Sequence, residues 1–288
     1  MRLKSDNLND MALKLRKKLN FYNEFKDVYF EIINDFKFDY HKDCKARDYL
    51  SGILAKKNHL WKIENILKSF KKLVVSKPVI LIYGCGPSLE VTVDIILNQK
   101  GRNFFNTFIN LAADGASVFL REKNIGIDGI FTDLDGITKK EFNYSNFNIV
   151  HAHGDNIEML KHFEKDILNF ENVIGTTQVE PLKNIINPGG FTDGDRILFF
   201  IHKLLNPSQM IFLIGMDFQN KVGKYSKLDI MNDQEANLIK KKKLRYAVEL
   251  IEWIKTKIPN EMLFINSEIV SDKYKYITIQ EFIEMINS

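Results

Sequence analysis

Cysteine is scarce in this chain, which contains only Cys44 and Cys85. Two cysteines cannot form the disulfide framework of a small secreted domain, so a reducing compartment is expected. No apolar run approaches the roughly 20 residues that a membrane-spanning helix needs. Residues 1–20 mix charges and lack the apolar core of a signal peptide. We therefore expect a cytoplasmic protein with no membrane contact.

The sequence also lacks an excess of charge of one sign. Its 41 basic and 37 acidic residues give a formal net charge of +4, and the two signs are interspersed along the chain. This pattern argues against a nucleic-acid-binding surface. A GxxxxGK[ST] loop is missing as well, which excludes the usual Walker cradle for nucleotide phosphates.

Glycine is almost absent from residues 1–76, which are rich in Lys, Asn, Asp and aromatic residues. Within this region Leu60, Ile63 and Phe70 recur at helical spacing, with Ile66 or Leu67 between them. The 288 residues suffice for one large domain with a smaller appendage. We predict a helical N-terminal region over residues 1–76, packed on a main domain over residues 77–288.

From Pro78 onward, short apolar runs alternate with segments of helical spacing. We predict strands over residues 79–83, 107–112, 129–132, 147–152, 172–176, 210–215 and 262–266, and helices over 88–99, 115–123, 156–168, 194–205 and 233–256. This alternation predicts an α/β fold with a doubly wound, mostly parallel, Rossmann-like sheet. The lysine run Lys240–Lys243 is predicted to be a solvated face of the last helix.

Small or acidic residues follow five of the predicted strands directly. These clusters occupy residues 84–88, 113–116, 133–136, 153–156 and 216–218. In an open parallel sheet the carboxyl ends of the strands share one edge, and ligands bind in the crevice there. We therefore expect the five clusters to converge on one site.

The first cluster resembles a dinucleotide-binding loop, but Leu89 holds the place of the third glycine of GxGxxG. Gly84 and Gly86 permit a tight turn and a close approach of the backbone to a ligand. Ser88 is predicted to cap the following helix, whose first N–H groups would face a phosphate. The alternative is a plain strand–helix turn. Cys85 is interpreted as a small apolar residue and not as a nucleophile, because no base lies near it in sequence.

Asp133 and Asp135 end the predicted strand 129–132. In an extended segment they would point to the same side, with Leu134 opposite, and would repel each other without a cation. Such a pair suits Mg²⁺, which takes few protein carboxylates and leaves its other positions to water and substrate phosphates. The alternative is that both aspartates stabilise turns. Asp114 and Asp155, at neighbouring strand ends, favour the metal.

A second acidic pair lies in the segment "GGFTDGDR". Its glycines, including Gly190, provide a turn, and Thr192 or Asp193 is predicted to cap the next helix. Capping needs only one of these polar residues, so the surplus acids suggest contacts with substrate or metal. Arg196 is either a substrate contact or a partner in a surface ion pair. His202, deeper in the same helix, is interpreted as a packing or surface residue.

His151 and His153 flank Ala152 near a strand end. A His-x-His pair with no third nitrogen or sulfur ligand does not make a zinc site. His153, beside Asp155 and Asn156, is interpreted as a polar contact to substrate or phosphate.

The motifs "GCGPSL", "ADGA", "TDLDG", "HAHGDN", "GGFTDGDR" and "GMDF" together resemble a known family. They resemble the archaeal 6-hydroxymethyl-7,8-dihydropterin pyrophosphokinases of tetrahydromethanopterin biosynthesis, whose domain type also occurs in flagellin-modifying motility accessory factors. The resemblance runs from about Tyr29 to the C-terminus. The order "ADGA…TDLDG…FTDGDR" is also similar to thiamine pyrophosphokinases. Gly136 in place of a serine, and the missing lysine before Thr192, count against thiamine as the substrate.

The resemblance implies Mg²⁺-dependent transfer of diphosphate from ATP to a reduced pterin, with AMP as the other product. It implies four catalytic aspartates, of which the first two would hold the metal: Asp133, Asp135, Asp193 and Asp155. The residues implied for nucleotide and substrate contacts are Gly84, Gly86, Ser88, Asp114, His153, Asn156, Gly190, Thr192, Arg196 and Asp217. The alternatives are a sialyltransferase-like glycosyltransferase of the motility accessory factor type, a thiamine pyrophosphokinase-like enzyme and a non-catalytic nucleotide-binding scaffold.

The sequence leaves four points open. It does not say which aspartate meets the pterin, whether the pterin is the true acceptor, whether one or two metal ions bind, or whether the chain forms a homo-oligomer.

Overall fold

The computed structural model describes residues 13–287, so residues 1–12 of the predicted N-terminal region lie outside the described part. The first described residues are helical over 13–19. Three helices follow: α2 (Tyr22–Phe36), α3 (Tyr40–Ala55) and α4 (Ile63–Val74). The apolar residues of α4 at helical spacing are buried, and Asp39 caps α3 by accepting a hydrogen bond from the His41 N–H. The helical character predicted for this region is therefore present from residue 13 onward, but Leu60 precedes α4 and is 71% exposed, so its place on the predicted apolar stripe is wrong.

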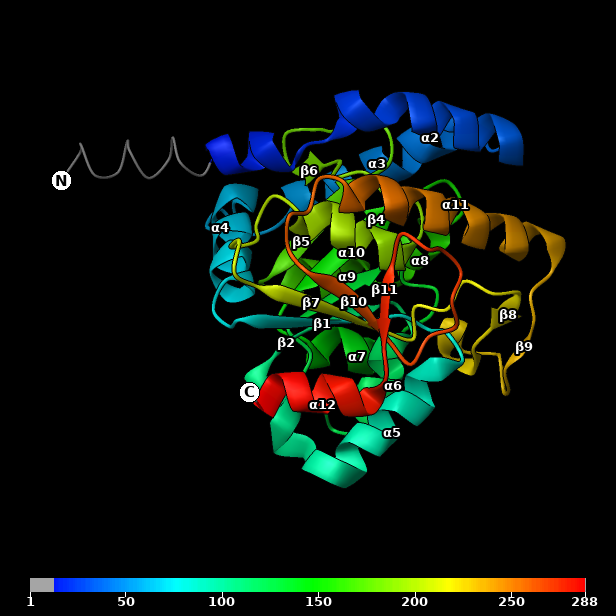
Figure 1. Cartoon of the computed structure of the whole chain (residues 1–288). Coiled ribbons are helices and arrows are strands. Elements are labelled where there is room, and N and C mark those ends of the chain that lie inside the picture. Colours follow the sequence, from blue (N-terminus) through cyan, green and yellow to red (C-terminus); the bar gives the residue numbers. More distant parts are fainter. Residues whose placement is uncertain (1–12, 288) are drawn as a thin grey trace.

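A parallel sheet forms the centre of the molecule (Figure 1). In sequence order its strands are β1 (Val79–Tyr83), β2 (Ile109–Ala113), β3 (Gly129–Thr132), β4 (Asn148–Ala152), β5 (Val173–Thr177), β6 (Ile185–Ile186), β7 (Met210–Ile214), β10 (Met262–Ile265) and β11 (Lys275–Ile277). Their spatial order is β11-β10-β7-β1-β2-β3-β4-β5-β6, and every neighbouring pair is parallel. The predicted α/β, doubly wound sheet is confirmed.

Helices cover both faces of this sheet (Figure 1). On one face lie α2, α4, α10 (Asp193–Ile201) and α11 (Leu238–Lys255). On the other lie α5 (Ser88–Lys100), α6 (Ala116–Glu122) and α12 (Ile279–Asn287), and around β4 and β5 also α3, α7 (Lys139–Tyr144), α8 (Ile157–His162) and α9 (Glu164–Asn169). Strand side chains alternate between the faces: Ile80 and Ile82 belong to the first core, Leu81 and Tyr83 to the second.

The N-terminal helices share a core with the sheet. Phe25, Tyr29 and Phe70 are buried in the same apolar cluster as Ile80 and Phe131. Because the two parts bury their apolar residues against each other, neither surface is left exposed to water. The boundary at residues 76 and 77 stays a prediction.

Two predicted helices differ from the observed ones. The helix predicted over 156–168 is divided into α8 and α9, with Phe163 between them. The last predicted helix begins at Leu238 and not at residue 233, because the Asn237 side chain caps it by accepting from the Lys240 N–H. The residues before Asn237 belong to an arm made of β8 (Lys221–Val222), η2 (Lys224–Ser226) and β9 (Gln234–Glu235).

Some short elements were not predicted: η1 (Arg102–Thr107), α7, β6, β11 and α12. Within the described residues no helix has the length and apolar character needed to cross a membrane.

The strand order reverses beside β1. From β1 the chain moves outward through β2 to β6, then returns to place β7 on the other side of β1. The loops after β1 and β7 lie against each other: the Gly84 N–H donates to the Ile214 carbonyl (2.8 Å) and the Gly86 N–H to the Gly215 carbonyl (2.7 Å). Ligands of open α/β sheets bind at such a reversal.

Candidate functional site

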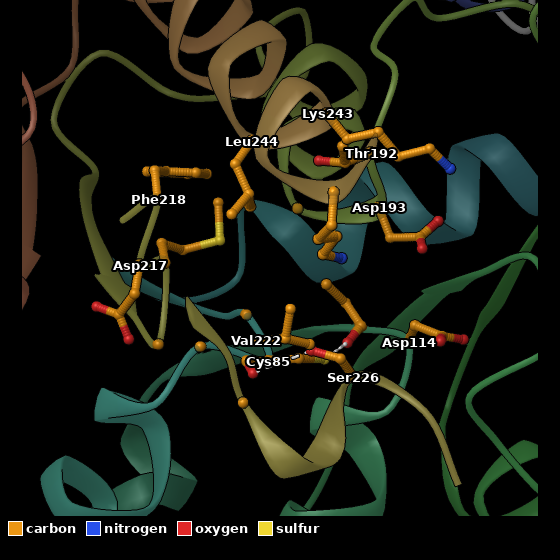
Figure 2. A pocket seen from close by; sticks show the side chains of 18 of the residues that line it. Cys85, Asp114, Thr192, Asp193, Asp217, Phe218, Val222, Ser226, Lys243 and Leu244 are labelled. Atoms are coloured by element: carbon orange, nitrogen blue, oxygen red, sulfur yellow. Dashed lines mark hydrogen bonds between the residues drawn. The ribbon is translucent and has the colours of Figure 1, made fainter. Parts of the chain in front are cut away.

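A cleft opens at the carboxyl edge of the sheet, where the strand order reverses. One part, here called the switch lobe, lies between the loops after β1 and β7 (Figure 2). It is lined by glycines, polar residues and a group of apolar side chains that includes Cys85, Met216, Phe218, Val222 and Leu244. These apolar side chains share the lobe with three aspartates and three lysines, which are Asp114, Asp193, Asp217, Lys221, Lys240 and Lys243.

A second part, here called the acidic lobe, has a volume of about 540 Å³. It is lined by the acids Asp39, Asp43, Asp114, Asp133, Asp135, Asp155 and Asp193, by His153, and by the bases Lys37, Lys42, Arg196, Lys227, Lys240 and Lys243. Asp114, Asp193 and Lys243 also line the switch lobe, so the two lobes are continuous. The cleft therefore joins the apolar side chains of the switch lobe to the strongly charged acidic lobe.

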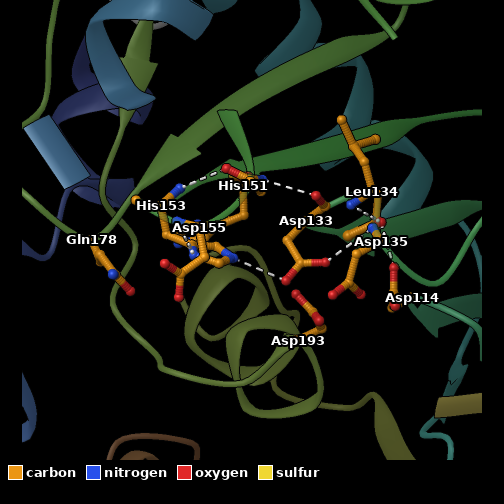
Figure 3. Close-up of polar contacts among 12 residues, drawn as sticks. Asp114, Asp133, Leu134, Asp135, His151, His153, Asp155, Gln178 and Asp193 are labelled. Carbon is orange, nitrogen blue, oxygen red and sulfur yellow. Dashed lines mark hydrogen bonds and ion pairs between the residues drawn. The ribbon is translucent and has the colours of Figure 1, made fainter. Parts of the chain in front are cut away.

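Asp114, Asp133 and Asp193 form the centre of the acidic lobe (Figure 3). Each offers a carboxylate oxygen, and these oxygens lie within 4.8 Å of one another. The three come from different segments: the end of β2, the end of β3 and the first residue of α10. Carboxylates this close repel each other unless a cation lies among them. In addition, Asp193 Oδ1 is buried without a hydrogen-bond partner, and Arg196 Nη1 lies 3.6 Å from it, so the oxygen can still accept a ligand. The oxygen set fits a hard divalent cation such as Mg²⁺.

Asp114 is held in a tightly constrained turn. Its φ is 42°, in the left-handed region that aspartate tolerates better than most residues. The Thr132 hydroxyl donates to Asp114 Oδ1 at 2.5 Å. A Cβ at Gly136 would come within 1.9 Å of Asp114 Oδ2, so only glycine fits there. Burial, and next the charge of Asp133, raises the pKa of Asp114 well above its ordinary value.

Asp133 is oriented by the loop that follows β4. His153 Nε2 lies 3.0 Å from Asp133 Oδ2, and the Asn156 side-chain amide donates to the Asp133 carbonyl at 2.8 Å. Burial opposes ionisation of Asp133, but the hydrogen bond and charge of His153 outweigh it and lower the pKa. Asp133 is therefore the most acidic of the three aspartates.

Asp193 lies beside Arg196, one helical turn away. The two side chains approach to 3.6 Å, and Arg196 is buried with only 6 % of its surface exposed. Burial, and then the charge of Asp133, raises the pKa of Asp193 to about 7. Arg196 is thus a buried partner of the acids, and the surface ion-pair alternative is wrong.

Asp135 does not share the geometry expected from its spacing. Leu134 adopts φ 77°, so residues 133–135 are not extended as the spacing predicted. The Asp135 carboxylate still lies near that of Asp133, because burial and next the charge of Asp133 raise the pKa of Asp135. Asp135 Oδ2 instead pairs with Lys227 of the arm at 3.1 Å, while its N–H donates to Asp133 Oδ1 at 3.3 Å. The buried Leu134 side chain explains the bend, because it packs with Phe142 and Val150 below the loop. A metal role for Asp135 stays a prediction.

The predicted phosphate cradle at Ser88 is already occupied by a protein carboxylate. The Ser88 N–H donates to Asp217 Oδ2 at 2.7 Å, and its hydroxyl donates to Asp217 Oδ1 at 2.9 Å. Ser88 is the first residue of α5, and its side chain does not cap the helix. The expectation of a Ser88 cap is wrong, since the Asp217 carboxylate accepts the hydrogen bond from the first N–H group of the helix instead.

Gly86 is explained by packing within the protein. A Cβ there would lie 2.4 Å from Asp217 Oδ2 and 2.7 Å from the Gly215 carbonyl oxygen. Gly84 is similar, with a Cβ 2.5 Å from the same oxygen. Both glycines line the switch lobe, and their contacts with a nucleotide stay predictions.

Two other predicted ligand contacts are placed away from the lining of the two lobes. Asn156 is buried and uses its side chain on the Asp133 carbonyl, the His151 carbonyl and the His153 N–H. Gly190, at φ 88°, turns the chain into α10, and a Cβ would meet the Arg196 backbone at 2.8 Å. These two residues therefore support the segments that carry Asp133 and Arg196, and they do not line the cleft themselves.

The polar residues at the start of α10 have two different roles, which are capping the helix and lining the cleft. Thr192 is the N-cap, and the buried Asp195 accepts hydrogen bonds from the N–H groups of Phe191 and Thr192 and from the Thr192 hydroxyl. Asp195 therefore stabilises the helix start, whereas Asp193 faces the cleft. Asp155 lines the acidic lobe as an exposed side chain.

The lysine run of α11 is only in part the solvated face that was predicted. Lys240 and Lys243 line both lobes, and Lys242 pairs with Asp35 outside the cleft. Burial, and next the charge of Lys240, lowers the pKa of Lys243. The prediction is wrong for Lys240 and Lys243 because α11 crosses the mouth of the cleft and directs these two side chains into it.

Cys85 and His202 behave as predicted. The Cys85 thiol donates to the Ala113 carbonyl and accepts from the Ala116 N–H, and burial raises its pKa, which keeps it protonated. His202 is buried, with Nδ1 against the Phe199 carbonyl.

Comparisons with known proteins identify the family. Residues 54–223 match a family described as "6-hydroxymethylpterin diphosphokinase MptE-like". A Methanocaldococcus jannaschii protein named 6-hydroxymethyl-7,8-dihydropterin pyrophosphokinase is 36% identical over 249 residues, which cover 83% of this chain and 98% of that protein. The chain belongs to the MptE-like diphosphokinase family. It is therefore an enzyme of the diphosphotransferase class.

Two further relatives of the MptE-like family carry the same name. The Pyrococcus furiosus protein is 35% identical, with 81% of this chain and 94% of that protein covered. The Methanothermobacter thermautotrophicus protein is 33% identical, with 78% and 91% covered. A solved glycosyltransferase, MAf of Magnetospirillum magneticum AMB-1, aligns with a TM-score of 0.41 and 11% identity over 74% of this chain and 37% of that one. That likeness is too slight to support any argument here.

Sequence reasoning missed several residues that line the site of this MptE-like enzyme. Lys227, Lys240 and Lys243 carried no signal beyond ordinary surface charge. Asp43 and Gln178 are buried polar residues of the cleft wall. Asp43 lies in the segment "DFKFDYHKDCKARDYL", which also resembles the family, but neither residue was assigned a role from the sequence. Asp43 also precedes residues 54–223, the part that the family description matches. These residues reach the site only through the tertiary structure, because they lie outside the six quoted motifs in sequence.

Proposed function

We propose that this enzyme transfers a diphosphate group from ATP to the hydroxymethyl group of 6-hydroxymethyl-7,8-dihydropterin. In this reaction the substrate hydroxyl oxygen forms a bond to the β-phosphorus of ATP, and the bond from that phosphorus to the α,β-bridging oxygen breaks. AMP leaves with the bridging oxygen, the pterin keeps the diphosphate, and the hydroxyl proton is released. The proposal is supported by membership of the MptE-like family and by the names of three relatives.

One structural observation carries the proposal: the trio of Asp114, Asp133 and Asp193 at the carboxyl edge of the sheet. Magnesium bound there would neutralise charge on the phosphates, which is most of what phosphoryl transfer needs from an enzyme besides positioning. These three aspartates are the proposed ligands. Asp135, which the sequence pairs with Asp133 as a metal ligand, is proposed to act beside them through its ion pair with Lys227.

The lysines of the acidic lobe are proposed to bind the polyphosphate. Lys240 and Lys243 line both lobes, and Lys227 and Lys42 line the acidic lobe. Ammonium groups around a carboxylate centre would hold an anion that the acids alone would repel. The negative charge of the ATP triphosphate would pair with the lysine ammonium groups, and a bound metal ion would offset its repulsion by the carboxylates.

The remaining residues are proposed to place the acceptor. The apolar side chains of the switch lobe, with Cys85 and Phe218 among them, suit a flat ring. Asp155 is an exposed carboxylate of the acidic lobe and is proposed to orient the attacking hydroxyl. His153 is proposed to hold Asp133 in its ionised form.

The test is a product analysis. Purified protein is incubated with Mg²⁺, ATP and 6-hydroxymethyl-7,8-dihydropterin, and the nucleotides and pterins are separated by chromatography. AMP and the pterin diphosphate should appear in equal amounts, and thiamine in place of the pterin should give little product. ADP as the nucleotide product would contradict the proposal, and so would release of CMP from a CMP-activated sugar without turnover of ATP.

A further inference from the structure

Asp43, in the N-terminal helix α3, is a buried carboxylate that joins three segments. Only 4% of its surface is exposed. Asp43 Oδ1 accepts from the Gly154 N–H at 2.6 Å, and Oδ2 accepts from the Tyr29 hydroxyl at 2.6 Å and from Gln178 Nε2 at 2.7 Å. A buried carboxylate with three short donors is fully satisfied, so its position is fixed.

The first connection leads from Asp43 to Asp133. Gly154 directly follows His153, whose ring nitrogen Nε2 lies 3.0 Å from Asp133 Oδ2. Helix α3 packs closely on this loop, because a Cβ at Gly154 would lie 2.6 Å from the Cβ of Lys42. Anchoring the Gly154 N–H therefore fixes the loop that orients Asp133.

The second connection leads from Asp43 to Asp193. A carboxylate only accepts hydrogen bonds, so Gln178 must turn its NH₂ group toward Asp43 and its carbonyl oxygen toward the other side. That oxygen accepts from Arg196 Nη2 at 3.1 Å, and Arg196 Nη1 lies 3.6 Å from Asp193 Oδ1. The alternation of acceptor, amide, guanidinium and carboxylate leaves one arrangement of the four side chains.

We propose that Asp43 is a positioning residue that sets the separation of Asp133 and Asp193, two of the three carboxylates at the centre of the acidic lobe. The inference rests on the metal site proposed above. It assigns a function to the N-terminal helical region, from outside the residues that the family description matches. Partners that orient metal ligands in this way change metal affinity by about 10- to 100-fold when removed.

The test measures Mn²⁺ binding to the full-length protein without substrates, by electron paramagnetic resonance of the free ion. Asp43→Asn replaces an acceptor oxygen by an NH₂ group that faces a donor, and should weaken Mn²⁺ binding by about 10-fold or more. Gln178→Met cuts only the connection to Asp193, and should weaken binding by a smaller factor. Thermal unfolding of every variant establishes that each is folded at the temperature of the titration.

Tyr29→Phe is the matched control. It removes one buried donor from Asp43 but lies on neither connection, so it should lower the melting temperature and leave Mn²⁺ affinity unchanged. Asp43→Asn and Gln178→Met binding Mn²⁺ as tightly as Tyr29→Phe would overturn the inference while the metal site stands. If Asp43→Asn does not fold, Gln178→Met decides alone. Absence of Mn²⁺ binding to the wild-type protein would overturn the metal site and the inference together.

Discussion

His153 Nε2 lies 3.0 Å from Asp133 Oδ2, so a side chain from the loop after β4 orients a carboxylate at the end of β3 (Figure 3). The two side chains are 22% and 19% exposed. The other oxygen, Asp133 Oδ1, accepts a long hydrogen bond from the Asp135 N–H at 3.3 Å. Burial opposes the ionisation of all three aspartates, but at Asp133 the hydrogen bond and charge of His153 outweigh it and lower the pKa, whereas the pKa values of Asp114 and Asp193 are raised.

The first prediction separates Asp133 from Asp135. Asp133→Asn removes the most acidic member of the trio and should lower kcat on the order of 100-fold or more, with the fold intact. Asp135→Asn breaks the exposed pair with Lys227 and should have a much smaller effect. Steady-state kinetics at limiting Mg²⁺, with circular dichroism as the check on folding, measures both. Equal losses in the two variants would return Asp135 to the set of metal ligands.

The second prediction concerns the lysines of α11. Lys243→Met keeps the length of the side chain but removes the charge, and should raise KM for ATP by about 10-fold, as expected for losing a hydrogen bond to a charged group. Lys241→Met serves as the control, because Lys241 lies outside both lobes and should leave KM unchanged. Similar KM values in the two variants would show that Lys243 does not contact the nucleotide.

The third prediction tests the packing of the loops after β1 and β7. A Cβ at Gly86 would lie 2.4 Å from Asp217 Oδ2, so Gly86→Ala should lower the free energy of unfolding by roughly 2–4 kcal/mol. Gly52, within α3, has no atom within 4 Å of such a Cβ. Gly52→Ala should therefore raise the free energy of unfolding by about 0.5–1 kcal/mol through helix propensity. Urea denaturation measures both, and a neutral Gly86→Ala would show that the loops separate easily.

The fourth prediction concerns acid stability. Burial lowers the pKa of His202 to about 4, and its Nε2 has no hydrogen-bond partner in the described structure. Between pH 6.5 and 4 this histidine is protonated in the unfolded chain but not in the folded protein. The free energy of unfolding therefore decreases as the pH falls through this range. The loss amounts to about 3 kcal/mol at most.

The measurement for His202 is urea denaturation at several pH values across that window. His202→Gln should flatten the decline in the free energy of unfolding, whereas His162→Gln, at an exposed helix end, should leave it as in the wild type. An unchanged decline in His202→Gln would place the acid sensitivity elsewhere.

The fold was predictable because strand and helix periods differ and are repeated along the chain. Runs such as "VILIY" and "MIFLIG" are buried on both faces and give an unbroken apolar signal. Short elements such as β6 and β11 give no such signal, since two or three residues carry no period. The division between α8 and α9 escaped notice because the apolar spacing continues across Phe163.

The site was predictable where polar residues follow strands directly, as with Asp114 and Asp133. Details that depend on three-dimensional contacts were not. The positive φ of Leu134, which bends the segment between Asp133 and Asp135, accompanies burial of the leucine side chain below the loop. The carboxylate of Asp217 at the start of α5 comes from a loop on the other side of β1, which local sequence does not reveal. Asp43 and Lys243 lie on helices, and their position at the cleft could not be recognised from the sequence of those helices.

The strand order has a consequence for how the protein is made on the ribosome. β1 is an inner strand, yet its second neighbour is β7, so one edge of β1 stays unpaired until the chain through Ile214 has emerged. At a synthesis rate of about 5–20 residues per second, that edge waits for several seconds or longer. An exposed apolar strand edge is a template for aggregation. The nascent chain therefore carries this unpaired edge during the same interval in which the wall of the switch lobe that follows β7 has not yet been made.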